Sequence, residues 1–430
     1  MRYVSTRGGA APVSFSAALM QGIAPDGGLY VPAQWPRFDA RAAPDALPVF
    51  AAALLETFVA DDPLADQLAA ITADAFSFPA PLNSIDGHPA QVLELFHGPT
   101  AAFKDFGARF LAACQARVPR AEGERPLHIL VATSGDTGGA VASAFHGRPG
   151  VQVSVLYPKG MVSPAQERQL TCWGGNVHAF AVHGAFDDCQ RLVKEAFVDS
   201  ALSAKFALSS ANSINVARLL PQMTYFAATS LAIWNEHGAP ASFVIPSGNL
   251  GHATACLWAR KLGLPIDQIV LAHNANRTMP DYLTSGEWRP RATIPTLASA
   301  MDVGDPSNGE RLRHLYPNLA ELRCAVTAYV VDDEAIRARI RTGWEQHAQI
   351  WCPHTAAAAE AFARHTQDGA VARRWVIVAT AHPAKFPEIV EPIIGQTIPV
   401  PPALAALPPA GSPTEIEPRL ATLRQSLLLS

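Results

Sequence analysis

Short apolar runs alternate with longer amphipathic runs over most of the chain, beginning near residue 127. The short runs are rich in β-branched side chains and predict buried strands at 128–133, 151–157, 177–182, 243–245, 269–273, 325–331 and 375–379. The longer runs repeat their apolar positions every three to four residues and predict helices at 138–146, 164–170, 186–198, 218–236, 252–262 and 334–347. Strand, helix and strand in this order predict an α/β fold whose parallel sheets are covered by helices on both faces.

The first 90 residues have a different pattern. They are rich in Pro and Ala, with helical periodicity at 14–21 and 42–58, and a Pro-Asp-Gly-Gly turn at 25–28 leads into a short strand. We therefore expect a small N-terminal domain over 1–90, which serves as a structural cap, and an α/β region over 91–390. The tail over 391–430 is broken by prolines, and we expect it to wrap the surface before a last short helix.

Composition narrows the class of protein. The chain has 430 residues, of which 49% are hydrophobic and 16% charged, so a disordered chain is excluded. The net charge is −4 and there is no long basic block, so neither nucleic acid nor a membrane is an expected partner. No signal-peptide core is present, and the six cysteines form no Cys-x-x-Cys pair, so we expect a cytoplasmic protein with no metal site and no disulfide framework.

Lys104 is the first candidate for chemistry. It follows a turn made by Gly98 and Pro99 and stands at the head of an amphipathic run that contains several phenylalanines. One interpretation is a surface lysine that extends into water beside Asp105. The other is an amine that has lost its hydration, because desolvation lowers the pKa of a lysine and allows it to attack a carbonyl group.

A second group of candidates lies where the predicted strands end, which is where open parallel sheets bind ligands. After the strand that ends at residue 133 comes a loop with two hydroxyls, an acid and free backbone amides, formed by Ser134, Gly135, Asp136 and Thr137. Such a loop before a helix can bind a carboxylate or a phosphate. The alternative is an ordinary helix-capping turn.

The loop at 246–252 is short and contains two glycines that bracket Asn249. It lacks both the Gly-x-Gly-x-x-Gly spacing of a dinucleotide fold and the Lys-Ser/Thr end of a P-loop, so it favours a monophosphate over ATP or NAD. The segment 212–218 offers amides, a hydroxyl and the guanidinium of Arg218 for a second phosphate, although its polar residues could equally cap a helix.

Taken together, these segments resemble the longer form of threonine synthase, within the tryptophan-synthase-β-like (fold type II) pyridoxal-phosphate enzymes. The matching motifs are HGPTAAFKD at 97–105, SGDTG at 134–138, NSIN at 212–215, SGNLG at 247–251 and TAHPAKF at 380–386. Further matches lie at 3–8, 24–32, 157–160, 300–302 and 307–311. The resemblance runs from Tyr3 to about Phe386 and implies two interleaved α/β subdomains with a cleft between them, over 91–390.

The resemblance also implies roles for individual residues. Lys104 is similar to the lysine that forms the Schiff base with pyridoxal 5′-phosphate and acts as the catalytic base. The expected contacts to this cofactor are Gly248, Asn249, Leu250 and Gly251 as the phosphate cradle, His252 at the start of the next helix, Thr380 at the pyridine nitrogen and Asp136 at the ring. The expected contacts to the substrate are Ser134, Gly135 and Thr137 at its carboxylate, and Asn212, Ser213 and Arg218 at its phosphate.

The implied reaction converts O-phospho-L-homoserine and water into L-threonine and phosphate, catalysed by a monomer or a homodimer. Two alternatives stay open at this point. A serine or threonine dehydratase would share Lys104 and the cradle but would not need Ser213 and Arg218 for a second anion. A phosphometabolite-binding protein without catalytic activity would keep the fold and remain colourless.

Overall fold

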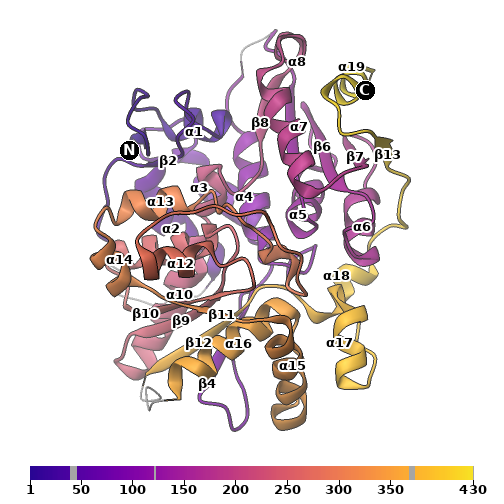
Figure 1. The fold of residues 1–430 in the computed structure, drawn as a ribbon. Coiled ribbons are helices and arrows are strands. Elements are labelled where there is room, and N and C mark those ends of the chain that lie inside the picture. Colours follow the sequence, from indigo (N-terminus) through magenta and orange to yellow (C-terminus); the bar gives the residue numbers. More distant parts are fainter. Residues whose placement is uncertain (39–45, 121–122, 368–372, 430) are drawn as a thin grey trace.

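Two parallel sheets organise the chain, as the computed structural model shows for residues 1–38, 46–120, 123–367 and 373–429 (Figure 1). The first sheet has the order β11 (Thr327–Val330), β10 (Ile266–His273), β9 (Ala241–Pro246), β12 (Arg374–Ala379), β4 (Ala90–Glu94) and β3 (Leu82–Ser84), with only β3 antiparallel to its neighbour. The second sheet has the order β13 (Thr414–Ile416), β7 (Val177–Val182), β6 (Val151–Pro158), β5 (Leu127–Ala132) and β8 (Ala207–Ser210), and is parallel throughout. The expected α/β class with parallel sheets is therefore confirmed.

The helices connect and cover these strands. In the N-terminal part they are α1 (Phe15–Gln21), α2 (Leu47–Val59), α3 (Leu68–Ala75) and the 3₁₀ turn η1 (Ala65–Gln67), and they accompany the antiparallel pair β1 (Tyr3–Ser5) and β2 (Tyr30–Pro32). The following helices are α4 (Lys104–Gln115), α5 (Asp136–Phe145), α6 (Pro164–Thr171), α7 (Phe186–Val198), α8 (Ser200–Lys205), α9 (Val216–Leu219), α10 (Gln222–His237) and α11 (Gly251–Lys261). Residues 42–45 of the helix expected at 42–58 lie outside the described residues.

The second half adds α12 (Thr278–Ser285), η2 (Ser299–Met301), α13 (Gly309–Leu315), α14 (Leu319–Ala325), α15 (Asp333–His347), α16 (Pro353–Thr366), η4 (Pro383–Lys385) and α17 (Pro387–Ile394). The C-terminal segment contributes α18 (Pro402–Ala405), β13 and α19 (Leu420–Leu429). In the part of the chain that the structure describes, none of these helices combines the length and the apolar character that crossing a membrane requires.

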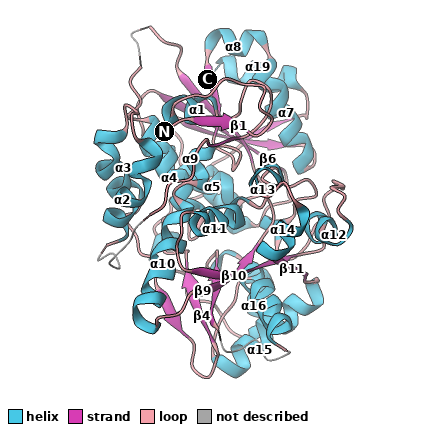
Figure 2. Cartoon of the chain, turned by 90° about the vertical axis from the view of Figure 1, so that its left-hand side faces the viewer, coloured by secondary structure: helices cyan, strands magenta, loops and turns pink. Residues whose placement is uncertain are grey.

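Side chains that alternate along the strands enter different cores. On β9, Phe243 and Ile245 belong to the large core between the two sheets, whereas Val244 belongs to a second core beneath α16. On β5, Ile129 points into the same large core and Leu130 into a third core beneath α7. Both sheets are thus buried on both faces, which explains why the sequences of their strands are continuous apolar runs. Figure 2 shows the sheets at opposite ends of the molecule, with α4, α5 and α11 between them.

The helix expected at 218–236 is wrong in one respect, because the structure has two helices there. Pro221 separates α9 from α10, since proline has no backbone N–H and its ring blocks the preceding turn. The short α9 carries Arg218. The last strand, β13, was also not expected: its three residues extend the second sheet by pairing with β7.

Candidate active site

Loops from both sheets line one cavity. The loops after β4, β9 and β12 approach it from the first sheet, and those after β5 and β8 approach it from the second. All of the predicted site residues except Gly135 line it: Lys104, Ser134, Asp136, Thr137, Asn212, Ser213, Arg218, Gly248, Asn249, Leu250, Gly251, His252 and Thr380. The carboxyl ends of the strands in both sheets therefore meet at a single place, as expected for ligand sites of parallel sheets.

Lys104 is the first residue of α4 and is only partly exposed. Burial lowers its pKa to about 8, helped by the nearby cations Arg218 and Lys385 and opposed by the carboxylate of Asp136. Asp105 does not pair with it at the surface. The Asp105 carboxylate is fully buried and accepts hydrogen bonds from the backbone N–H of Thr100 at 2.9 Å and from its hydroxyl at 2.7 Å. The interpretation of Lys104 as a surface lysine beside Asp105 is therefore wrong.

The lysine loop is joined to the loop after β12. The N–H of Phe103 donates to the carbonyl of Thr380 at 2.8 Å, and the N–H of His382 donates to the carbonyl of Ala101 at 3.0 Å. These bonds connect segments that are about 280 residues apart in sequence. They fix Thr380 relative to Lys104 across the cavity.

The loop after β5 is shaped by Thr133, whose hydroxyl oxygen accepts from the N–H groups of Gly135 at 3.0 Å and Gly138 at 2.9 Å. Gly135 has φ +133°, and a side chain on it would collide with the amide of Gln166. Glycine is therefore required at position 135 for the shape of this loop, and Ser134 and Asp136 on either side of it line the cavity.

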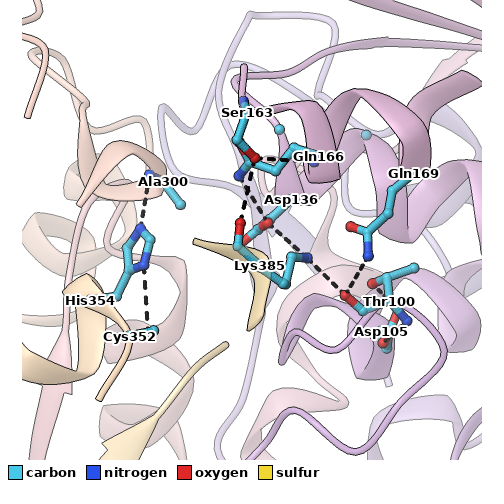
Figure 3. A network of polar contacts seen from close by, with 12 residues as sticks. Thr100, Asp105, Asp136, Ser163, Gln166, Gln169, Ala300, Cys352, His354 and Lys385 are labelled. Carbon is cyan, nitrogen blue, oxygen red and sulfur yellow. Dashed lines mark hydrogen bonds and ion pairs between the residues drawn. The ribbon is translucent and has the colours of Figure 1, made fainter. Parts of the chain in front are cut away.

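Asp136 is the centre of a buried polar network, shown in Figure 3. The ammonium group of Lys385 lies 2.9 Å from its Oδ1, and the side-chain amide of Gln166 donates to the same oxygen at 3.2 Å. Although burial opposes ionisation, Lys385, Lys104 and His354 hold the pKa of Asp136 well below its usual range. Asp136 is thus a carboxylate at the cavity wall, with its charge compensated from behind.

The loop after β9 has the geometry of an anion cradle. A Cβ on Gly248 would lie 2.7 Å from the Cα of Met301, so only glycine permits this close approach of two backbones. Leu250 has φ +62°, and its left-handed conformation turns the chain into α11, whose N-terminal amides face the cavity. Free amides at the N-terminus of a helix of this length suit a phosphate group.

His252 stands beside this cradle. Its ring stacks on Phe103 with 4.3 Å between centroids, and neither ring nitrogen has a hydrogen-bond partner among the described residues. Burial lowers its pKa to about 3, with a contribution from Lys104, so the imidazole is neutral. Two buried nitrogens without partners leave hydrogen-bonding capacity for a ligand in the cavity.

The segment expected to bind a second anion is coupled to the cradle. The side-chain amide of Asn249 donates to the hydroxyl of Ser213 at 2.5 Å, and the amide of Asn212 is already used by the carbonyl of Ala132. Arg218 is buried and donates to the carbonyl of Ala211, while its Nε has no partner in the part of the chain that the structure describes. Burial lowers the pKa of Arg218 to about 10, so it is a cation at neutral pH that lines the cavity.

Several residues of the site were not predicted. His354, at the start of α16, lines the cavity and accepts from the N–H of Ala300 at 3.0 Å, and Lys385 lies directly behind Asp136. The only signal for either was its place within a short motif, next to a helix start or a strand end. Cys352, preceding His354, is the N-cap of α16, because its sulfur accepts from the N–H of Thr355 at 3.4 Å.

Comparisons with known proteins agree along the whole chain. Family models described as "Pyridoxal-phosphate dependent enzyme", "Threonine synthase N terminus" and "Threonine synthase, C-terminal" match residues 90–381, 2–76 and 355–419. A threonine synthase from Serratia marcescens is 42% identical over 401 residues, which cover 91% of each protein. The crystal structure of threonine synthase from Escherichia coli is 37% identical, covers 100% of both chains and has a TM-score of 0.87. The structure of pyridoxal-phosphate-bound threonine synthase from Brucella melitensis is 34% identical, covers 99% of this chain and 98% of that one, and has a TM-score of 0.90.

Proposed function

This chain belongs to the threonine synthase family of pyridoxal-phosphate enzymes, and we propose on that basis that it converts O-phospho-L-homoserine and water into L-threonine and phosphate. One observation carries the proposal beyond family membership. A lysine whose pKa is lowered to about 8 by burial shares a cavity with a glycine cradle and with a buried arginine. One cavity thus offers an amine and two separate places for anions.

The residues present fit pyridoxal 5′-phosphate. We assign its phosphate to Gly248, Asn249, Leu250 and Gly251 with His252 beside them, its aldehyde carbon to Lys104, and its ring to Thr380 and Asp136. When bound, the cofactor supplies a conjugated ring that withdraws electrons from the α-carbon of the amino acid. The close approach at Gly248 and the unpartnered nitrogens of His252 support this assignment.

The chain's own groups then have distinct tasks. The Nζ of Lys104, when unprotonated, takes the proton from the substrate's α-carbon. Ser134, Thr137 and the amides of their loop bind the substrate carboxylate and fix the orientation of the α-carbon, and Gly135 gives that loop its shape. Arg218 and Ser213, with Asn212 beside them, bind the substrate phosphate and stabilise its charge as the bond between the γ-carbon and oxygen breaks.

Overall, the β-carbon loses a proton and gains the hydroxyl of water, and the γ-carbon gains a proton as its bond to the phosphate oxygen breaks. The remaining proton goes to the released phosphate, so the reaction needs no oxidant. Phe103 and Met301 line the cavity with apolar surface, which reduces the water around Lys104. This keeps its amine a usable base at neutral pH.

The test offers purified, cofactor-loaded protein O-phospho-L-homoserine and L-serine in parallel assays. We expect phosphate and threonine from the first substrate and no keto acid from the second. Lys104→Ala should abolish turnover, whereas Lys159→Ala, which removes a lysine from a surface ion pair with Glu415, should not. A keto acid from serine without phosphate release, or near-normal turnover by Lys104→Ala, would contradict the proposal.

We further propose that the enzyme acts in the cytoplasm as a monomer or homodimer and has neither nucleic acid nor a membrane as a partner. The net charge of −4 and the absence of a long basic block support this view. Light scattering coupled to size-exclusion chromatography determines the oligomeric state directly.

A further inference from the structure

Lys385 lies behind the cavity and has no place in the reaction described so far. It is fully buried on η4, and its ammonium group contacts Oδ1 of Asp136 at 2.9 Å and the carbonyl of Thr100 at 2.8 Å (Figure 3). It does not line the cavity, whereas Asp136 does. A buried ammonium group is costly unless it is paired, so its position needs an explanation in terms of Asp136.

We propose that Lys385 is a positioning residue for the reaction assigned above: it neutralises Asp136 from behind, so that this carboxylate does not hold the amine of Lys104 as an ammonium ion. The inference rests on the proposed role of Lys104 as the base. It adds a residue to that role and explains why an acid is tolerated at position 136.

The charges around Lys104 give the reason. Asp136 on α5 is an anion, and Arg218 on α9 and Lys385 on η4 are cations, all close enough to affect Lys104. His252 on α11 and His354 on α16, which faces Asp136, are neutral because burial lowers their pKa values to about 3 and about 4. Without Lys385, the carboxylate would be left with one nearby lysine to pair with, and that lysine is the proposed base.

A purely structural role is the alternative. Lys385 donates to the carbonyl of Thr100, which also accepts from the amide of Gln169 at 3.2 Å, so it could merely stabilise the turn before Lys104. A structural role predicts lower stability in variants of Lys385 but no change in the proton affinity of Lys104. The two explanations therefore differ in a measurable quantity.

The experiment uses cofactor-free full-length protein, in which the pH dependence of acetylation at Lys104 is followed by peptide mass spectrometry. The variants are Lys385→Met, Asp136→Asn and the double variant, with Lys159→Met as the matched control. We expect Lys385→Met to raise the apparent pKa of Lys104 by about one unit or more, and Asp136→Asn to lower it. The double variant should return to a value close to that of the wild type, because both opposing charges are gone.

A second measurement, the pH midpoint of the visible absorbance of the cofactor-loaded variants, should move in the same directions. Labelling of the cofactor-free protein needs no substrate, so failure of the proposed reaction would leave this test intact. Unchanged Lys104 values in both single variants would overturn the proposal. If the single variants do not fold, a folded double variant with a near-normal Lys104 value supports it, and a double variant that is unfolded or has a shifted value overturns it.

Discussion

The burial of Lys104, a functional amine, lowers the stability of the folded protein. Two neighbouring carboxylates already have other partners. Asp136 forms an ion pair with Lys385, and Asp105 accepts hydrogen bonds from Thr100. The folded protein therefore binds the proton of Lys104 less tightly than the unfolded chain does. This difference makes stability depend on pH in a defined direction.

We expect Lys104→Met to stabilise the cofactor-free protein. The pKa of Lys104 falls from 10.5 to about 8 on folding, which corresponds to about 3 kcal/mol. This penalty is present in full below pH 8 and disappears as pH rises through 10.5, since the amine is then neutral in both states. Urea unfolding at pH 7 and at pH 11 measures the effect, and an equal gain at both values would contradict the explanation.

Gly248 offers a prediction about the cradle. We expect Gly248→Ala to weaken cofactor binding by about 10- to 100-fold, because the added methyl group would meet the backbone of Met301 at 2.7 Å. Gly251→Ala is the graded comparison, since its methyl group would meet the movable amide of Asn308 at 3.2 Å. Cofactor titration followed by fluorescence measures both; equal affinities for Gly248→Ala and the wild type would refute the cradle geometry.

At the residue scale, the sequence was most informative where the backbone itself is unusual. The loops at 134–138 and 247–251 could be predicted because their glycines permit conformations and close approaches that side chains forbid. Lys385 and His354 could not be singled out, because their importance comes from contacts with distant segments. The roles assigned to the individual site residues stay predictions until the variants are measured.

At the scale of elements, buried strands with continuous apolar runs were recognised well. The strand expected at 177–182 and the helix expected at 186–198 coincide with β7 and α7. Strands without that pattern were missed, since β8 reads Ala-Leu-Ser-Ser and β13 has only three residues. Such strands are held by pairing and by tertiary contacts, which local sequence does not report.

The C-terminal helix gives a prediction at this scale. Leu423 of α19 is fully buried in the core that α19 shares with α7. We expect Leu423→Ala to lower the free energy of unfolding by about 2–5 kcal/mol, because it leaves a cavity. Leu428→Ala, on the same helix but 37% exposed, is the control and should change it by less than about 0.5 kcal/mol. Similar losses in both variants would mean that α19 is not packed as described.

At the scale of the whole molecule, Arg311 connects the N-terminal part to the site. Arg311 is fully buried and donates to the carbonyls of Tyr30, Ser213 and Ile214 at 3.1, 3.1 and 2.6 Å, and to the side chain of Asn308 at 2.6 Å. It therefore connects β2 with the segment that carries Ser213. The N-terminal part thus supports the wall of the cavity as well as covering the core.

We expect Arg311→Lys to raise KM for O-phospho-L-homoserine and to lower the free energy of unfolding by about 2 kcal/mol or more. A lysine keeps the charge but cannot reach all four acceptors, so buried carbonyls lose their partners. Steady-state kinetics and urea unfolding measure the two effects. Arg323→Lys, at an exposed arginine that donates to Leu283 and Thr284, is the control, and an unchanged KM in Arg311→Lys would contradict the connection.

The pairing of β13 with β7 has a consequence for the newly made chain. β13 is synthesised more than two hundred residues after β7, and it pairs with the last three residues of β7 at that edge of the second sheet (the yellow segment on the right of Figure 1). At ribosomal rates of about 5–20 residues per second, on the order of 10–50 s pass between the synthesis of β7 and the synthesis of β13. During that interval a nascent chain presents an open strand to its neighbours on the polysome, and every prematurely terminated copy presents it permanently.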